Sequence, residues 1–490
     1  MIKLKAEPTK RNKFMKRYIL LILSLFPVFL FAGGSESGHA LHLDGSIENL
    51  GIIWIVPFIG ILLSIAIFPL VSPEIWHHHF GKVSLFWALS FVIPFLFKEG
   101  LSITIYEIFH VALLEYIPFL ILLLALFTIS GGVRLTGSLV GTPVVNTLII
   151  FVGTVLASWM GTTGAAMLLI RPIIRANEFR KNKTHIIVFF IFLVANIGGS
   201  LTPLGDPPLF LGFLKGVDFF WTTKAMITPM IFMVISLLLI FYSYDSYLFK
   251  KENVNSEKES DEIPLGLEGS FNLYLLFGVI CAVLLSGFWK PNVSFNVYHV
   301  DVELQNIIRD LILLGLTYFS WTMTSKKIRD DNEFTWFPIE EVSKLFAAIF
   351  ITIIPAIAIL KAGTEGALAP VVVSVTSEAG PVNIMYFWLT GILSSFLDNA
   401  PTYLVFFNTA GGDASILMTE KYTTLLAISM GAVFMGANTY IGNAPNFMVK
   451  SISESSGIKM PSFFGYFFKW AVPILMPLFL IISLLYFFPF

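Results

Sequence analysis

Residues 202–210 read TPLGDPPLF, and residues 439–447 read TYIGNAPNF. The two stretches match in Thr, Gly, Pro and Phe at equal spacing, and Asp206 stands opposite Asn443. Helix-breaking Gly and Pro within apolar sequence are tolerated at membrane depth only where the backbone is buried in protein or lines a wet cavity. The match therefore predicts two broken helices in two repeated halves of a membrane protein.

The composition of the whole chain supports this interpretation. Of 490 residues, 56% are hydrophobic and 13% are charged, and the mean hydropathy is +0.81. A soluble protein carries about 25% charged residues. These values exclude a soluble enzyme and a disordered chain, and the single cysteine excludes a disulfide scaffold. A formal net charge of -1 gives no reason to expect nucleic acid as a partner. The sequence predicts an all-α polytopic membrane protein in a lipid bilayer.

A membrane-crossing helix needs about 20 mostly apolar residues. The sequence predicts about ten such spans, at 50–71, 83–97, 107–129, 184–201, 224–243, 271–289, 304–323, 343–361, 421–438 and 466–488.

Basic residues in short loops predict how these spans are oriented. The segments 171–183 and 326–329 are rich in Lys and Arg, which places both on the cytoplasmic side. With the amino terminus outside, both loops reach that side only if 139–174 and 382–409 enter and return as re-entrant hairpins. Each half then has five spans and one hairpin in opposite orientation, as in inverted-topology repeats. The alternative, a continuous span at 139–160, would place the first basic loop outside.

The chain divides into four parts. Residues 1–34 form a signal-like segment with a basic start and a short apolar run, which is either cleaved or kept as an anchor. Residues 35–244 form the first repeat half, 245–269 a polar linker loop, and 270–490 the second, inverted half. We expect a multi-pass protein of a bacterial inner (cell) membrane with its mature amino terminus outside.

A second pair of broken stretches lies in the predicted hairpins. Residues 158–164 read SWMGTTG, and residues 395–402 read SFLDNAPT, in which Asp398 is the one carboxylate. An ionisable group at the centre of a membrane helix costs ~2.5–3.5 kcal/mol. Asp206 and Asp398 are therefore expected to be functional. Freed carbonyls, Thr hydroxyls and Asn amides can replace the hydration shell of a small ion.

Other ionisable residues are less informative. His39, His42 and Asp44 follow the signal-like segment and could bind a metal, but a polar linker is the simpler interpretation. The histidines at 77–79 are expected in a solvated loop. Glu115 is expected to face a pore or to snorkel, with a proton relay as the alternative.

These motifs resemble those of the ion transporter superfamily, and more narrowly the NhaD-type sodium/proton antiporters and the citrate-transporter-like proteins. The resemblance covers roughly residues 50–488. It implies a scaffold domain, a transport domain with two re-entrant hairpins and two broken helices around a midplane site, and a homodimer. The binding residues that it implies are Thr162, Thr163, Asn196, Thr202, Asp206, Asp398, Asn399, Thr402, Asn438, Thr439 and Asn443.

One departure from the family bears on the substrate. In dicarboxylate-type members both hairpin tips carry Ser-Asn-Thr, whereas residues 161–163 read GTT and residues 398–400 read DNA. This difference argues against carboxylate transport.

The leading hypothesis is a secondary active cation/proton antiporter that exchanges sodium for protons by alternating access. One carboxylate can hold a proton or help to bind sodium, but not both well, so Asp206 and Asp398 are the expected sodium ligands. The partners are then sodium ions and protons, and no cofactor or enzymatic activity is expected, since no ATP-binding G-x-x-x-x-G-K-[ST] signature occurs.

Three alternatives remain open. A citrate or dicarboxylate symporter would need positive potential at the site, yet the broken stretches contain almost no Lys or Arg. An intramembrane aspartyl protease would need G-x-G-D, which Pro203 interrupts. A passive channel is disfavoured because inverted halves favour alternating access.

Overall fold

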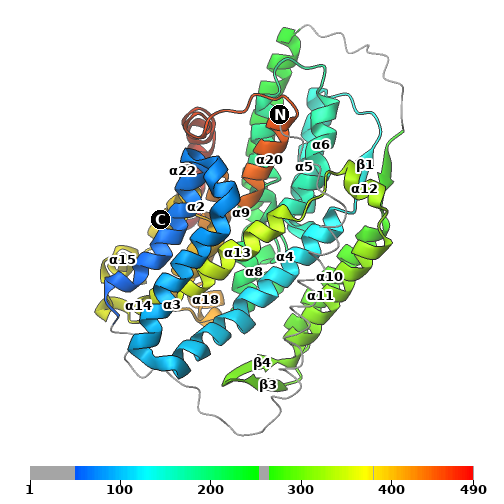
Figure 1. Cartoon of the computed structure of the whole chain (residues 1–490). Helices are drawn as coiled ribbons and strands as arrows, with labels where there is room; N and C mark the ends of the chain where they lie inside the picture. Colours follow the sequence, from blue (N-terminus) through cyan, green and yellow to red (C-terminus); the bar gives the residue numbers. More distant parts are fainter. Residues whose placement is uncertain (1–49, 253–263, 379, 489–490) are drawn as a thin grey trace.

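The computed structural model describes residues 50–252, 264–378 and 380–488. The predicted signal-like segment and the possible ligands His39, His42 and Asp44 lie outside these residues. Within them the chain is a bundle of helices, with three short antiparallel strand pairs at its ends (Figure 1). The predicted fold class, an all-α polytopic membrane protein, is confirmed.

The first half runs from a short 3-10 turn to the long helix α9. Its elements are η1 (Ile52–Ile55), α2 (Val56–Val71), α3 (Pro73–Val111), η2 (Ala112–Tyr116), α4 (Ile117–Ser130), β1 (Arg134–Thr136), α5 (Pro143–Met160), α6 (Thr162–Ala176), α7 (Thr184–Leu193), η3 (Ile197–Ser200), α8 (Pro207–Leu214) and α9 (Phe219–Glu252).

The second part of the chain has more short helices. Its elements are β2 (Gly266–Glu268), α10 (Phe271–Phe288), β3 (Ser294–Val297), β4 (Val300–Glu303), α11 (Leu304–Met323), α12 (Lys326–Asp331), α13 (Phe337–Thr352), α14 (Ile354–Lys361), η4 (Gly363–Glu365), α15 (Ala369–Val375), β5 (Thr376–Ser377), β6 (Gly380–Pro381), α16 (Asn383–Phe396), α17 (Asn399–Thr409), α18 (Ala414–Met418), α19 (Tyr422–Met435), η5 (Gly436–Asn438), α20 (Ala444–Ser455), α21 (Phe463–Tyr466), η6 (Phe467–Ala471) and α22 (Val472–Phe487). The strands pair as β1–β2, β3–β4 and β5–β6.

Seven helical segments of the described residues are long and apolar enough to cross a membrane. One of them, Pro73–Ser130, has 58 residues and turns back at Gly100, where φ is 85°, so it forms two long arms (Figure 1). Two of the predicted spans are the shorter apolar segments Thr184–Ser200 and Tyr422–Asn438, which are the first parts of the broken helices. The predicted span 304–323 is helix α11.

The two predicted hairpins are present, and they enter the bundle from opposite ends. Helices α5 and α6 meet at Gly161, where φ is 81°, and the Gly141 amide donates to the Ala176 carbonyl oxygen at the base of this hairpin at 2.7 Å. Helices α16 and α17 meet at 397–398 and return toward the other end. Helix α5 by itself is long and apolar enough to cross a membrane, so the choice between a re-entrant hairpin and a continuous span at 139–160 stays a prediction.

The basic loops lie together at one end of the molecule, which we call the basic end; it carries residues 131–142, 177–183 and 324–336. Arg134 pairs with Asp331 at 2.9 Å, and Arg171 pairs with Glu333 at 3.0 Å. The β3–β4 pair lies at the opposite end (Figure 1). The cytoplasmic location of the basic end stays a prediction.

Helix α9 extends into the stretch expected to be a linker, since it continues to Glu252. Asp245 is buried there and accepts from Arg180 Nη2 at 2.7 Å and from Asn146 Nδ2 at 3.0 Å, and it lies 2.8 Å from His185 Nε2. This buried network connects the base of the α5–α6 hairpin to α7 and α9, and it explains why residues 245–252 are helical.

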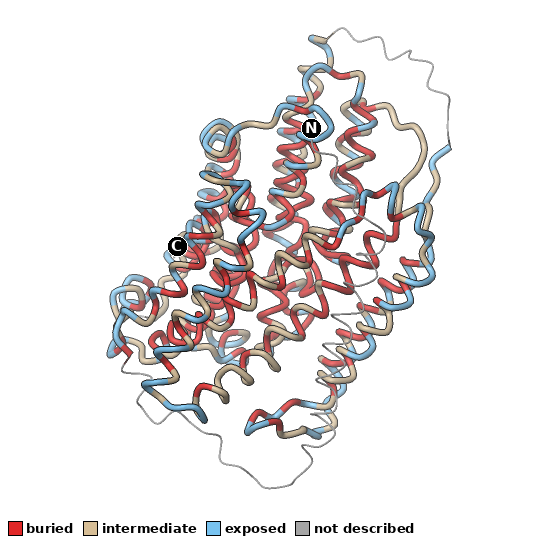
Figure 2. The backbone as a smooth tube through the Cα atoms, viewed as in Figure 1, coloured by how far each residue is buried: buried red, intermediate tan, exposed pale blue. Residues whose placement is uncertain are grey.

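Burial is concentrated around the broken helices. In Figure 2 the buried positions gather in the interior of the bundle, while α10 and α11 at its edge are mostly exposed or intermediate. The exposed residues of the outer helices are large and apolar, such as Phe277 and Phe319. These helices therefore present an apolar surface suited to lipid, and the polar residues of the broken stretches are kept inside.

We predict that Glu178→Cys and Lys327→Cys react with a membrane-impermeant thiol reagent from the same side, and His299→Cys from the other. The exposed Cys281 is first replaced by Ser to give a silent background. Labelling in intact cells and in inverted vesicles checks the result. Reaction of positions 178 and 327 from different sides would contradict the hairpin topology.

Candidate functional site

The two broken helices place equivalent residues at equivalent bends. After η3 the chain turns and α8 begins behind Asp206, and after η5 it turns and α20 begins behind Asn443. Both residues are the N-caps of their helices and have extended backbone, with φ values of -143° and -155°. Proline in the first turn suits such a start because its amide has no hydrogen to leave unpaired.

Each broken helix is bonded to the hairpin of its own half in the same way. The Thr202 hydroxyl donates to the Ser158 carbonyl oxygen, and the Thr439 hydroxyl donates to the Ser395 carbonyl oxygen. Both pairs are separated by 44 positions, so the sequence match corresponds to a match in three dimensions. These two Thr residues, predicted as ion ligands, therefore act in this structure as structural donors.

The matched glycines permit a close contact of the backbone. A Cβ on Gly205 would lie 2.1 Å from the Gly199 carbonyl oxygen, and one on Gly442 would lie 2.6 Å from the Gly436 carbonyl oxygen. No side chain fits at these distances, so each bend is compact only with glycine.

Asp206 is the centre of the site. Its carboxylate accepts from Thr162 Oγ1 at 3.2 Å, Asn443 Nδ2 at 2.9 Å and Asn399 Nδ2 at 2.6 Å, and the residue is 1% exposed. The donors come from the first hairpin tip, the second hairpin tip and the second broken helix. One buried acid thus forms hydrogen bonds with residues from both halves of the chain.

Asp398 lies at the second hairpin tip and is more accessible. It caps α17 through a 3.0 Å bond that its Oδ1 accepts from the Ala400 amide. The residue is half-buried and lines two cavities described below. Asn399, the next residue, connects this tip to Asp206.

The remaining predicted residues surround this centre. Thr163 lines the smaller cavity, and Thr402 donates to the Asp398 carbonyl oxygen at 2.9 Å. Asn196 Nδ2 donates to Asn446 Oδ1 at 2.7 Å, and Asn438 Nδ2 donates to Ser395 Oγ at 2.8 Å. The hydrogen bonds therefore bring Thr162, Asn399 and Asn443 to Asp206, while the other predicted residues bond within the surrounding segments.

Three residues that matter here were not among the predicted ligands: Ser158, Ser395 and Asn446. Asn446 Nδ2 donates to the carbonyl oxygens of Gly436 at 2.9 Å and Thr439 at 2.8 Å. The two serines occupy equal positions before their Thr partners, and that constant spacing is a signal that could have identified them.

Three buried amide oxygens near these bends have no hydrogen-bond partner in the described part of the chain: Asn196 Oδ1, Asn399 Oδ1 and Asn438 Oδ1. A buried polar atom without a protein partner calls for an explanation, and a bound ion or water is a common one. Amide and carboxylate oxygens are the ligands that hard cations prefer.

Two neighbouring cavities reach the site. One of about 100 Å³ is lined by Asp206 and the first hairpin tip, and one of about 440 Å³ leads from the 73–78 segment to Asp398. Both are lined by Asp398 and Asn443. Among the described residues that line the two cavities there is no Lys or Arg, while acids line both.

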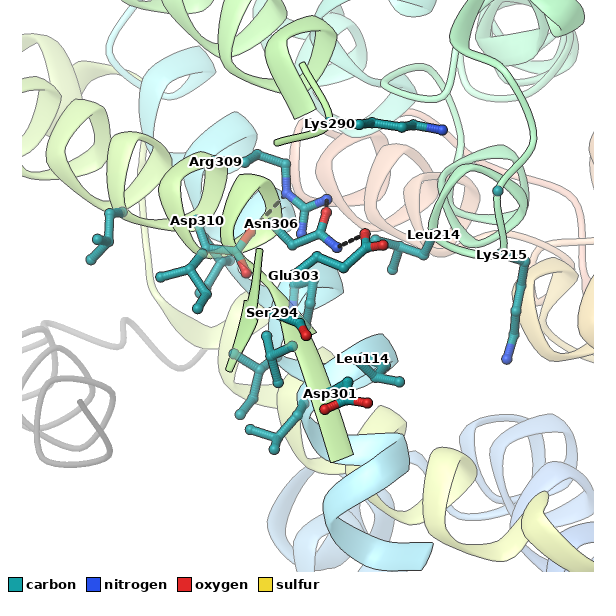
Figure 3. Close-up of a pocket in the computed structure, with 18 of the residues that line it drawn as sticks. Leu114, Leu214, Lys215, Lys290, Ser294, Asp301, Glu303, Asn306, Arg309 and Asp310 are labelled. Atoms are coloured by element: carbon teal, nitrogen blue, oxygen red, sulfur yellow. Dashed lines mark hydrogen bonds and ion pairs between the residues drawn. The ribbon is translucent and has the colours of Figure 1, made fainter. Parts of the chain in front are cut away.

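A third cavity, of about 560 Å³, lies at the opposite end and shares no lining residue with the other two (Figure 3). Arg309 Nε donates to Asp310 Oδ1 at 2.8 Å, and Lys215 pairs with Glu115 at 2.5 Å. This pairing gives the buried Glu115 a structural partner. The charged residues that line the cavity are Lys215, Lys290, Asp301, Glu303, Arg309 and Asp310.

Comparison with known proteins gives one finding. A family model described as "Putative citrate transport" matches residues 47–487. No curated protein matches the chain significantly.

We predict that Gly205→Ala destabilises the protein by about 1–3 kcal/mol, the usual cost of overpacking a rigid core, because a backbone carbonyl oxygen cannot swing away as a side chain can. Gly315→Ala is the matched control, since nothing lies within 4 Å of its added Cβ. Thermal unfolding in detergent measures both variants. Equal melting temperatures would show that the bend is not as closely packed as described.

Proposed function

The chain belongs to the family described as citrate transport, within the ion transporter superfamily, and from that premise we propose that it exchanges sodium ions for protons by alternating access. Membership in this family makes it a multi-pass membrane transporter. The choice of substrate is the proposal. It needs neither a cofactor nor an enzymatic reaction, because the ion gradients supply the driving force.

The observation that carries the proposal is the carboxylate of Asp206, which accepts hydrogen bonds from Thr162, Asn399 and Asn443. A carboxylate bound to sodium cannot also hold a proton, so one site can serve both ions in turn. Asp398 lines the same cavity and supplies a second acid. We propose that sodium binds between Asp206 and Asp398 and displaces a proton from them.

Amide oxygens complete the proposed ligand set. Asn399 directs its Nδ2 to Asp206, which leaves its buried Oδ1 free to face a cation. Asn196 and Asn438 hold unpartnered oxygens at the two broken helices. Oxygen atoms of neutral amides bind a cation without adding charge, so the net charge of the site changes little when sodium replaces a proton.

The two hairpins are the segments whose movement could open the site to one end of the protein and then to the other. Their tips meet at Asp206, yet they enter from opposite ends, so a small movement of the tips and broken helices against α4 and α13 would expose the site to either end. In this structure the larger cavity gives the route toward the basic end. We place that end in the cytoplasm of a bacterial cell and expect a homodimer in the inner membrane.

Citrate or dicarboxylate symport is the second candidate. The family description favours it, and Lys215, Lys290 and Arg309 line the cavity at the opposite end. Those cations stand beside an equal number of acids, and that cavity shares no lining residue with those at Asp206. A citrate anion near Asp206 and Asp398 would face like charge, so we prefer the antiporter.

We predict that sodium dissipates an imposed proton gradient in proteoliposomes and that citrate does not. A pH-sensitive dye reports the flux after addition of sodium, lithium, potassium or citrate, with empty liposomes as the control. Sodium-coupled citrate uptake without sodium-driven proton release would replace the antiporter with the symporter.

We further predict that Asp398→Asn abolishes sodium-dependent proton flux while the protein still inserts and dimerises, because a neutral amide is cheaper to bury than an acid. Asp206→Asn should abolish flux or shift its pH dependence, since Asn443 shows that an amide fits the equivalent bend. Size-exclusion chromatography checks the assembly. Flux near the wild-type level in Asp398→Asn would remove Asp398 from the mechanism.

A further inference from the structure

The cavity of about 440 Å³ connects the basic end to the proposed ion site. Its outer part is lined by Glu74, His77 and His78, which are exposed, and its inner part by Asp398 and Asn443. Burial therefore increases along the cavity from its mouth to the site, as expected for an access route.

Glu341 lines this same cavity and belongs to none of the motifs discussed above. It lies in the first turns of α13, a membrane-crossing segment, and is half-buried. Its Oε1 accepts from Trp76 Nε1 at 3.1 Å, and the indole is itself buried at 6% exposure. The partner of this acid is a neutral hydrogen-bond donor, and its side chain lines the cavity.

The neighbouring acid shows the contrast. Glu340 pairs with Lys344 at 2.6 Å, is 35% exposed in its side chain and does not line the cavity. Glu341 forms no ion pair with any described residue, and no Lys or Arg is among the described residues that line its cavity. The negative charge of Glu341 thus acts on the cavity without local compensation.

We infer that Glu341 is a capture residue for cations on the route from the basic end to Asp398. The inference rests on the proposed exchange of sodium for protons. Trp76 holds the carboxylate in the cavity wall, between the exposed histidines at the mouth and Asp398 within. A negative charge in a cleft with low-dielectric walls raises the local concentration of cations by about tenfold or more, and it repels anions.

The test compares Glu341→Gln with the matched control Glu340→Gln in proteoliposomes of defined orientation. Initial rates of proton flux are measured against sodium concentration added at the basic end and, separately, at the opposite end. We expect Glu341→Gln to raise the apparent KM for sodium added at the basic end by about tenfold, with kcat from that end near wild type. Because exchange through one site obeys detailed balance, kcat/KM from the opposite end should fall by the same factor. Glu340→Gln should match wild type at both ends.

Ionic strength gives a readout that a merely structural role would not change. The difference between Glu341→Gln and wild type should shrink in high choline chloride, because salt screens the charge in an open cavity. Trp76→Phe keeps the acid but removes its hydrogen bond, and it should raise KM at the same end by a smaller factor.

Equal KM values at the basic end for Glu341→Gln and Glu340→Gln would overturn the inference, as would a fall in kcat with unchanged KM at that end. These outcomes differ from a failure of the proposed function. If the wild-type protein shows no sodium-dependent proton flux, the exchange itself is wrong, whereas normal wild-type exchange with an unaffected Glu341→Gln removes only the capture role.

Discussion

The burial of one carboxylate organises this molecule. Asp206 is 1% exposed, and its oxygens accept hydrogen bonds from Thr162, Asn399 and Asn443. A buried charge without such donors would be prohibitively costly. Because the donors belong to two hairpins and to the other broken helix, the acid is stable only when both halves of the chain are in place around it.

The breaks, hydrogen bonds and glycines of the interior hold Asp206 and its donors in position. A continuous helix could not aim an N-cap residue at the centre of a bundle, so both helices break and restart behind a proline-containing turn. The bends are held by matching Thr-to-Ser hydrogen bonds, and they are compact because Gly205 and Gly442 lie against the backbone of a preceding turn. The outer helices need only apolar surfaces, which the composition supplies.

Much of this fold could be predicted from the sequence because membrane proteins obey few and strong rules. Hydropathy located the crossings, and basic residues in short loops required the re-entrant hairpins. The matching stretches predicted Asp206 and Asp398 as site residues, and the two acids line one cavity. Each of these features depends on local sequence or on a count of charges, which no packing detail alters.

What the sequence did not reveal depends on contacts between distant segments. Nothing local distinguishes Thr162, which reaches Asp206, from Thr202, which bonds to the backbone of a hairpin. The helix α9 passes its predicted end because Asp245 is buried against Arg180 and His185, residues far away in the chain.

The sodium and proton specificity remains our proposal. Proton release on sodium binding to the purified protein tests it most directly. In weakly buffered detergent solution, a pH dye should report protons released as sodium is added, and none from Asp206→Asn. Citrate binding accompanied by no sodium-dependent proton release would contradict the account.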